Sequence, residues 1–277
     1  MLALYEKTCR ECSQHITKKY STSFSLGIRV FHKKYRAPIY SIYGFVRFAD
    51  EIVDTFHGFN KAKLLREFRE DTYKAIHNKI SLNPVLHAFQ EVVNAYNIDH
   101  EFIDAFLDSM EMDLFNSVYD QESLDKYIYG SAEVVGLMCL RVFCPDPKEF
   151  DRLMPTAKAL GSAFQKINFL RDMKSDYEER GRVYFPNIDF TNFTNKEKQM
   201  IEDDILKDFD HAYTGIVELP QGVRLGVYLA YVYYKTLFKK IKNTTAKHIA
   251  HERIRVRNRK KILLLGTSAL RNSFNML

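Results

Sequence analysis

The stretch YSIYGFVRFADEIVDTF, residues 40–56, is the part of the sequence that says most about the fold. A helix turns by about 100° per residue, so four polar side chains of this stretch share an arc of roughly 60°; they are Tyr43, Arg47, Asp50 and Asp54. The other faces are apolar, whereas a surface helix carries a narrow apolar stripe on a polar cylinder. We therefore expect a helix inside the protein, with its polar stripe facing a polar cavity.

Two carboxylates on a buried helix must be paired or bind a cation, because an isolated charge is costly to bury. Asp50 and Asp54 lie four residues apart and project side by side. Both can therefore approach a magnesium ion, which prefers oxygen ligands. The alternative is structural, with Arg47 paired to Asp50 and Asp54 at the rim. Taken alone, this stretch does not decide between the two.

A second acidic segment, QKINFLRDMKSD at residues 165–176, repeats the pattern. Its polar side chains share an arc of about 80° and are Gln165, Asn168, Asp172 and Asp176. Arg171 lies beside them, and Arg182 and Tyr184 follow. A solvated helix face explains this segment equally well when it is taken alone. Two such pairs, each with a nearby arginine, favour carboxylates on facing helices that hold magnesium and a diphosphate.

Helical periodicity runs through most of the chain, and almost no segment alternates as a strand would. Pro38 suits the first turn of a helix, Asn83 suits a helix start, and Thr194 with Glu197 forms a capping box. The longest irregular stretch is expected at 181–193. The predicted helices span 3–18, 37–57, 61–78, 83–95, 99–116, 123–143, 147–177, 195–217, 222–242 and 248–272. We predict one all-α domain over residues 1–277.

The composition is that of a globular protein and excludes several classes, since 46% of residues are apolar and 27% are charged. Cys9 and Cys12 form a C-x-x-C without the further ligands of a zinc site, so we expect reduced thiols. Residues 1–19 lack the apolar core of a signal peptide. The longest apolar stretch, 223–234, is too short to span a bilayer. We therefore expect a cytoplasmic protein without a membrane-spanning segment.

A basic stretch near the C-terminus, residues 251–261, carries six cations and is followed by the apolar residues 262–265. One interpretation is a solvated helix face. The other is peripheral contact with the anionic inner face of the membrane, where each nearby cation adds about 1 kcal/mol. Nucleic-acid binding is not expected, because no motif for it accompanies the charges.

The two acidic segments resemble the signatures of the squalene and phytoene synthases, R-x-x-D-[DE]-x-x-D and N-x-x-R-D-x-x-x-D. Here these signatures occupy residues 47–54 and 168–176, and the basic-Tyr segment RVYFP follows at 182–186. YSTSF at 20–24 is similar to the family's S-x-S-F. MDL at 112–114 and YIYGSAEVVG at 127–136 resemble its middle elements, so that the likeness covers about residues 5–270.

Three positions depart from that pattern. Glu51 stands where many members have a second aspartate, so a carboxylate is kept on a longer stem. Ser131 and Glu133 stand where small or apolar residues are common. Glu133 either points to solvent or adds polarity to a cavity wall, and the sequence leaves both alternatives open.

The resemblance implies an isoprenoid-synthase-type helical bundle around a central active-site cavity. It implies magnesium, or manganese in its place, bound by Asp50, Glu51, Asp54, Asn168, Asp172 and Asp176. It implies substrate binding by Ser21, Ser23, Phe24, Tyr127, Gln165, Asn168, Arg171, Arg182 and Tyr184. The catalytic set that it implies is Tyr43, Arg47, Asp50, Asp54, Asp172 and Asp176. Phe24, Tyr43 and Tyr127 are candidate cavity-wall residues, although plain core packing explains each of them as well.

The implied activity is the head-to-head joining of two prenyl diphosphates through a cyclopropyl diphosphate. The motifs look most like those of bacterial phytoene synthases, which use geranylgeranyl diphosphate in carotenoid biosynthesis and need no nicotinamide. The rival is a squalene or dehydrosqualene synthase that uses farnesyl diphosphate; the squalene-forming members need a nicotinamide reductant. We expect no C-terminal membrane anchor, which resembles bacterial members. A non-catalytic assembly partner is disfavoured, because such relatives usually lose the carboxylates. The oligomeric state is not indicated.

Overall fold

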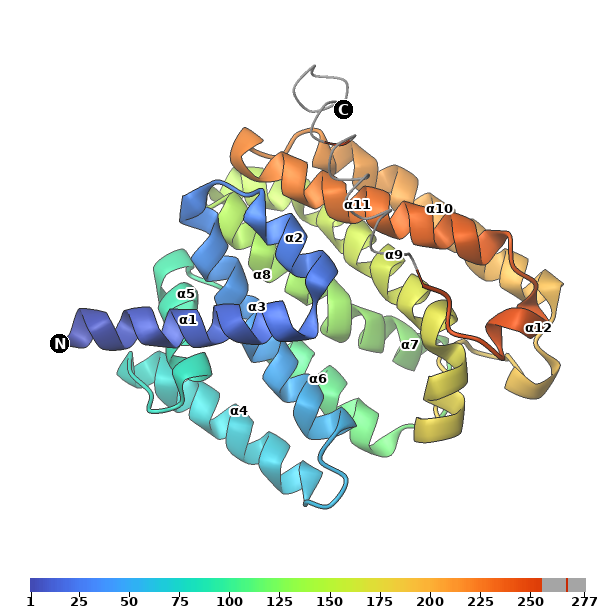
Figure 1. Cartoon of the computed structure of the whole chain (residues 1–277), viewed down its shortest axis with the longest axis horizontal. Coiled ribbons are helices and arrows are strands. Elements are labelled where there is room, and N and C mark those ends of the chain that lie inside the picture. Colours follow the sequence, from blue (N-terminus) through green and yellow to red (C-terminus); the bar gives the residue numbers. More distant parts are fainter. Residues whose placement is uncertain (256–267, 269–277) are drawn as a thin grey trace.

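The structure, a computed structural model, describes residues 1–255 and 268, and helices make up nearly all of its regular structure (Figure 1). The prediction of an all-α fold is therefore confirmed. In chain order the elements are α1 (Leu2–Tyr20), α2 (Thr22–Arg29), α3 (Lys33–Asp54), α4 (Lys61–Asn78), α5 (Pro84–Tyr96), α6 (His100–Phe115), α7 (Gln121–Ile128), the π-turn η1 (Tyr129–Glu133), α8 (Val134–Phe143), α9 (Pro147–Arg180), the 3₁₀ turn η2 (Phe190–Asn192), α10 (Asn195–Ile216), α11 (Gln221–Lys242) and α12 (Ala246–Ile249).

Most helix starts lie where their capping residues predict. The Asn83 side chain accepts hydrogen bonds from the first backbone N–H groups of α5, and Thr194 and Glu197 form the predicted capping box of α10. The position of Pro38 was predicted wrongly, because α3 begins at Lys33 and the proline lies inside it. A proline inside a helix leaves the carbonyl four residues earlier without its partner. Helix α2 was not predicted; at eight residues it is too short for a clear periodicity.

The predicted helix at 248–272 is wrong over residues 250–255, which follow α12 as a turn and a segment without regular structure. Tertiary contacts outweigh helix propensity here. Ile254 is buried, and Lys240 of α11 donates a hydrogen bond to the carbonyl of Arg255 at 2.8 Å. The rest of that helix, and with it most of the basic stretch, lies outside the described residues apart from Ser268.

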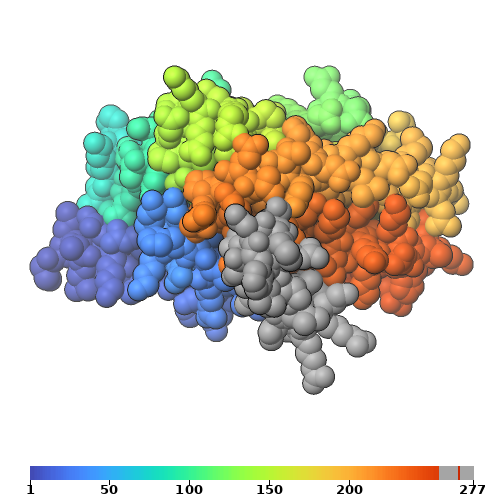
Figure 2. All heavy atoms as spheres, turned by 90° about the horizontal axis from the view of Figure 1, so that it is seen from above, coloured from blue at the N-terminus to red at the C-terminus, as the bar shows by residue number. Residues whose placement is uncertain are grey.

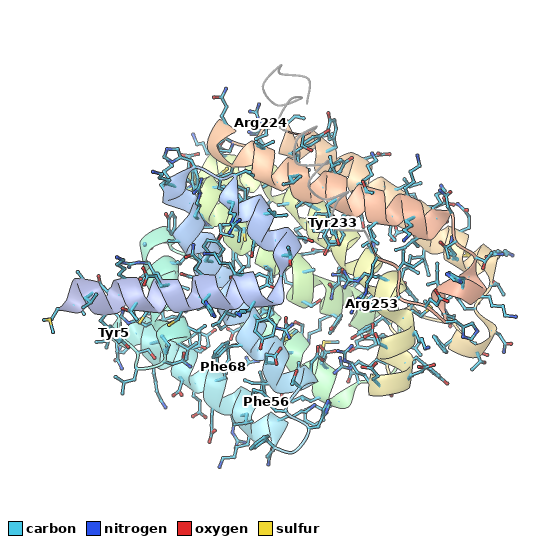
Figure 3. All side chains as sticks on the ribbon, viewed as in Figure 1. Tyr5, Phe56, Phe68, Arg224, Tyr233 and Arg253 are labelled. Carbon is cyan, nitrogen blue, oxygen red and sulfur yellow. The ribbon has the colours of Figure 1, made fainter. Side chains whose placement is uncertain are left out.

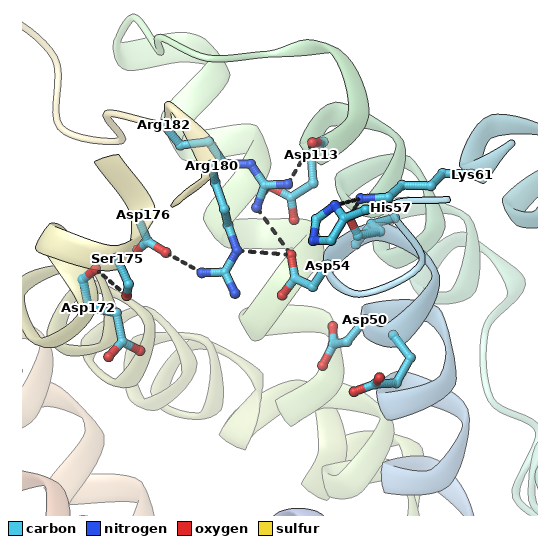
Figure 4. Close-up of polar contacts among 12 residues, drawn as sticks. Asp50, Asp54, His57, Lys61, Asp113, Asp172, Ser175, Asp176, Arg180 and Arg182 are labelled. Carbon is cyan, nitrogen blue, oxygen red and sulfur yellow. Dashed lines mark hydrogen bonds and ion pairs between the residues drawn. The ribbon is translucent and has the colours of Figure 1, made fainter. Parts of the chain in front are cut away.

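Two groups of buried apolar side chains fill the interior. In one group the ring of Phe45 on α3 stacks on Phe89 of α5, with 3.9 Å between ring centroids. In the other, Phe169 on α9 stacks on Tyr184 at 4.1 Å. Val227 of α11 packs against both groups. Helix α3 belongs to the first group, whereas α9 contributes Phe150 and Leu153 to the first and Phe169 to the second. The acidic side chains of α3 and α9 are turned toward each other (Figure 4).

The segment predicted as one helix at 123–143 contains a π-turn, η1, between α7 and α8. Gly130 lies in this turn against α6, and a Cβ atom at this position would be 2.2 Å from the carbonyl oxygen of Ala105. Only glycine permits so close an approach of two backbones. The turn therefore brings α7 against the end of α6, and this contact shapes the site described below.

Figure 2 shows the N-terminal helices, in blue, at one end of the molecule and α10 to α12, in orange and red, toward the other. The apolar stretch at 223–234 lies within α11, whose neighbours are α2, α9 and α10. In the described part of the chain, none of the helices has the length and apolar character needed to cross a bilayer.

Candidate active site

The acidic pairs of α3 and α9 face each other across a gap that an arginine spans (Figure 4). Asp50 and Asp54 come from the last turns of α3, and Asp172 and Asp176 from the second half of α9. The guanidinium of Arg180 lies 3.5 Å from the carboxylate of Asp54 and 2.7 Å from that of Asp176. The two motifs that were predicted to meet are therefore brought together.

Arg47 lies on the polar stripe of α3, as the helical spacing predicts. Its closest partner is Glu51, whereas the carboxylate of Asp50 is 3.8 Å away. The guanidinium also lies over the ring of Tyr20, 4.3 Å from the centroid, and its Nε is buried without a hydrogen-bond partner. The internal Arg47–Asp50 pair is therefore a loose one. Because Glu51 accepts from Arg47, its role as a metal ligand stays a prediction.

The negative charges between the helices are only partly compensated. Burial raises the pKa of Asp50 from 3.8 to about 7, and the charges of Asp54 and Asp113 act in the same direction while Arg47 opposes them. Burial likewise raises the pKa of Asp176 to about 6, opposed chiefly by Arg180. A further cation in this gap would therefore stabilise the ionised carboxylates.

On α9, Asp172 is held by two arginines. Arg171 donates to both carboxylate oxygens, with Nε 3.0 Å from Oδ1. Arg253, from the segment after α12, lies beside α9 (Figure 3) and places its Nε 2.6 Å from the same oxygen. One cation of the basic C-terminal stretch thus contacts a predicted site residue, which neither interpretation of that stretch foresaw.

Arg182 is carried to the same gap by the turn that ends α9. Gly181 adopts the left-handed conformation, with φ of 66°, and the backbone N–H of Arg182 donates to the carbonyl of Asp176 at 2.8 Å. The next residue, Val183, donates from its backbone to the carbonyl of Ser117 at 2.8 Å. The guanidinium of Arg182 then lies 3.4 Å from the carboxylate of Asp54.

Asp113, in the last turn of α6, collects three donors. Arg182 lies 3.2 Å from its Oδ1, the hydroxyl of Tyr127 donates to Oδ2 at 2.8 Å, and the hydroxyl of Tyr184 lies 3.4 Å from Oδ1. Burial raises the pKa of Asp113 to about 7, with Arg182 opposing the shift. Tyr119 packs on both tyrosines, at 5.3 and 5.2 Å between ring centroids.

The aromatic side of this group borders a pocket. Tyr127 and Tyr184 lie 5.1 Å apart by ring centroid and pack with Phe169 of α9. The side chains that line the pocket come from α9, the loop after it and the first residue of η2; they are Phe169, Met173, Asp176, Arg182, Val183, Tyr184, Phe185, Ile188 and Phe190. The charged side chains of Asp176 and Arg182 thus line the same hollow as several aromatic rings.

The residues predicted on α2 lie against α3, one or more turns before the acidic pair. Ser21 caps α2, its hydroxyl accepting from the backbone of Phe24 at 3.2 Å. The ring of Phe24 packs on Tyr43 at 5.3 Å between centroids, and burial raises the pKa of Tyr43. Ser23 is half-buried on the same helix. Binding of a diphosphate by these two serines stays a prediction.

The predicted amides of α9 are already hydrogen-bonded within the protein. Gln165 donates to the hydroxyl of Ser131 at 3.1 Å and accepts from Asn168 at 3.3 Å. The oxygen of Asn168 accepts from the hydroxyl of Tyr234 at 3.2 Å. Glu133 forms an ion pair with Lys158 of α9 at 3.4 Å, and its side chain is mostly buried. It therefore neither points freely to solvent nor stands unpaired in a cavity wall, the two alternatives that the sequence left open.

The donor set between α3 and α9 fits a hard divalent cation. It consists of carboxylate oxygens in two pairs, which magnesium favours together with waters and substrate phosphates. In residues 1–255 and 268, no three acidic, histidine or cysteine side chains converge closely enough to hold an ion by themselves. The pairs therefore fit a cation that takes its remaining ligands from a bound anion and water.

Three residues of this group were not predicted as site residues: Asp113, Arg180 and Arg253. Asp113 belongs to the MDL element, and the likeness of that element to the family's was the available signal. Arg180 follows Asp176 by four residues, so helical spacing places the two on one face. No local signal could indicate Arg253, because its partner lies 81 residues earlier in the chain.

Comparisons with known proteins show the family and the fold of the chain. The family model described as squalene/phytoene synthase matches residues 17–260. The 4,4'-diapophytoene synthase of Staphylococcus haemolyticus is 26% identical over 209 residues, 75% of this chain and 72% of that protein. The 15-cis-phytoene synthase of Synechocystis is 28% identical over 286 residues, 94% of this chain and 84% of that protein. A crystal structure of a dehydrosqualene synthase in complex with ligand superposes with a TM-score of 0.80 at 21% identity, covering 96% of each chain.

Proposed function

The chain belongs to the squalene/phytoene synthase family, and from this premise we propose that it is a phytoene synthase. The substrate would be geranylgeranyl diphosphate, two molecules of which are joined head to head through a cyclopropyl diphosphate. The observation that carries the proposal is the opposition of two aspartate pairs on α3 and α9, with arginines between and beside them (Figure 4). Such a group suits a substrate that is anionic at one end and bound with a cation.

The arginines account for the anionic end of the substrate. Arg47, Arg171 and Arg182 each lie beside a carboxylate of the gap. A guanidinium offers paired N–H donors that match the oxygens of a phosphate group. When the diphosphate enters, these arginines exchange part of their contact with carboxylates for contact with phosphate oxygens. They then hold the leaving group while the C–O bond of the first substrate breaks.

Magnesium, or manganese, would be held by Asp50, Asp54, Asp172 and Asp176 and would neutralise negative charge on the departing diphosphate. The four carboxylates supply oxygen donors from two helices, so both helices contribute to one anion site. The raised pKa values of Asp50 and Asp176, each caused mainly by burial, support a site that is short of positive charge before the ion enters.

The aromatic side chains suit the carbon chemistry. Loss of the first diphosphate leaves an allylic cation, which the double bond of the second substrate attacks; loss of a proton closes the cyclopropane ring. Tyr127, Tyr184 and Phe169 form an aromatic surface beside Arg182. Aromatic faces stabilise a nearby cation and exclude water that would quench it. The second ionisation returns another diphosphate to the same arginines.

A product assay tests the proposal. Purified protein with magnesium is given geranylgeranyl or farnesyl diphosphate separately, and the extracted hydrocarbon is identified by mass. Phytoene, with forty carbons, from the longer substrate is the expected result. A thirty-carbon product from the shorter substrate alone would move the protein to the squalene or dehydrosqualene branch. No product from either, even with a nicotinamide reductant present, would refute the catalytic proposal.

A further inference from the structure

Asp113 is the most enclosed carboxylate of the site and has no role in the chemistry described so far. Its side chain is 5% exposed, and that of its partner Arg182 is 8% exposed. It lies in the last turn of α6, near the negative end of the helix dipole, where a carboxylate is disfavoured. Such a position needs strong compensation, which suggests that the side chain does more than fill space.

Among the described residues, the side chains that contact the Asp113 carboxylate within hydrogen-bonding or ion-pair distance are donors. Arg182 contacts Oδ1, Tyr127 donates to Oδ2, and Tyr184 also lies within reach of Oδ1. Arg182 further donates from Nη2 to the backbone carbonyl of Asp113 at 2.7 Å. An ionised carboxylate accepts at both oxygens and donates nothing, so it matches this set of donors. An asparagine of the same shape would have no charge for Arg182 and only one oxygen to accept with, because its NH2 group would replace the other.

The same nitrogen of Arg182 serves two carboxylates. Its Nη1 lies 3.2 Å from Asp113 and 3.4 Å from Asp54. Asp54 belongs to the pair that would bind the cation, so its contact with Arg182 weakens when the site fills. Asp113 then remains as the partner that keeps the guanidinium in place, because it holds both the terminal nitrogens of Arg182.

We infer that Asp113 is a positioning residue for diphosphate binding. It fixes the guanidinium of Arg182, and with it the hydroxyl of Tyr127, so that Arg182 points into the gap between α3 and α9 before substrate enters. The inference rests on the proposed function. Preorganised donors bind an anion more tightly than donors that must first be ordered, and this difference is what an experiment can measure.

The test is calorimetric binding of inorganic pyrophosphate with magnesium, which needs no turnover. We expect Asp113→Asn to weaken binding about tenfold or more, because a buried charge-assisted contact is lost. The matched control is Asp108→Asn on the same helix, where Asp108 accepts from Arg69 at 2.6 Å but is half exposed. That variant should change the affinity by less than about twofold, since exposed pairs contribute little.

A double mutant separates positioning from a merely structural role. If Asp113 acts through Arg182, Asp113→Asn should add less than about twofold to the loss already caused by Arg182→Gln. A structural role would lower the midpoint of thermal unfolding and leave the affinity of the folded protein unchanged, which would overturn the inference. If Asp113→Asn does not fold, Asp113→Glu replaces it; it keeps the charge but displaces the carboxylate, and an unchanged affinity would overturn the inference equally.

The outcome for the unaltered protein distinguishes the two proposals. If it binds magnesium pyrophosphate and Asp113→Asn binds as tightly, the positioning inference is wrong and the proposed function stands. If the unaltered protein binds no magnesium pyrophosphate, the proposed function fails, and the inference fails with it.

Discussion

The aspartate pairs of α3 and α9 share a four-residue spacing but differ in how closely arginines contact them. Within the part of the chain that the structure describes, the nearest cation to Asp50 is Arg47 of α3 at 3.8 Å. The other member, Asp54, lies 3.4 and 3.5 Å from Arg182 and Arg180. These are long contacts for ion pairs, in which nitrogen and oxygen usually approach to about 2.7–2.9 Å.

On α9, by contrast, both carboxylates have close partners. Asp172 accepts from Arg171 and lies 2.6 Å from Arg253. Asp176 lies 2.7 Å from Arg180. The same motif thus yields one pair that is open to a cation and one that must first release arginines. Equal spacing in sequence does not therefore imply equal affinity for a metal ion, because neighbours from other elements decide it.

The largest expected effect is common to both pairs. Asp50→Ala and Asp172→Ala should each lower product formation about 10²- to 10³-fold or more. Each substitution removes a carboxylate that would hold the cation, and the cation would stabilise the departing diphosphate. Circular dichroism should show an intact fold in both variants. Near-normal turnover by either variant would show that its aspartate pair does not take part in the reaction. Only the other pair would then belong to the active site.

A smaller effect should follow from removing the arginine between the pairs. Arg180→Gln leaves Asp54 and Asp176 facing each other without their shared cation. We expect magnesium with pyrophosphate to raise the unfolding midpoint of this variant by about 2 to 4 °C more than it raises that of the unaltered protein. The control is Arg152→Gln, whose partner Glu218 lies at the surface away from the gap. An equal rise in both variants would mean that Arg180 does not stand in for the cation.

The open pair should also make stability depend on pH. The folded protein holds the pKa of Asp50 at about 7, above its ordinary 3.8, mainly by burial. The folded protein therefore favours the protonated form of Asp50 more than the unfolded chain does. This preference contributes fully to stability below about pH 4, and the contribution is lost as the pH rises to about 7. In metal-free buffer, Asp50→Asn should lose less stability than the unaltered protein between about pH 5.5 and 7.5. Identical pH profiles from thermal unfolding would contradict this; part of the slope belongs to Asp113 and Asp176 and should remain.

The smallest effect concerns the outer arginine of the closed pair. Arg253→Gln removes one of the two arginines that contact Asp172. The side chain of Arg253 is about half exposed. Exposed ion pairs contribute at most about 1 kcal/mol, so the magnesium concentration for half-maximal activity should fall by no more than about fivefold. Lys247→Gln, on the exposed face of α12, serves as the control. A rise in the required magnesium would mean that Arg253 helps to bind the anion instead of competing with the metal.

The sequence predicted the helices well because their periodicity is local. The extent of α4 was predicted to the residue, whereas α2 was missed and Pro38 was placed one turn too early in its helix. The acidic pairs were predicted because both members of each pair lie on one helix. Their meeting across α3 and α9 was predicted because the same spacing, with a nearby arginine, occurs twice in the chain.

The rest of the site depends on contacts between distant segments. Asp113 and Arg182 are 69 residues apart, and only the packing of α6 against the turn after α9 joins them. Arg253 reaches Asp172 because the segment after α12 leaves the helical path at Ile249, which periodicity did not indicate. Charges whose partners lie in other elements cannot be assigned from spacing alone.

The π-turn at Tyr129–Glu133 sets the rotational phase of the helix that carries Tyr127. A π-turn accommodates one residue more than an α-helical turn, and each residue rotates a helix by about 100°. We therefore expect deletion of Ser131 to leave α8 in place in the core and to rotate α7 by about that angle. The rotation would move the hydroxyl of Tyr127 away from Asp113. In this protein the extra residue of the π-turn changes the rotation of α7 relative to α8. The two helices therefore continue one another while α8 presents its side chains to the core and α7 presents Tyr127 to the site.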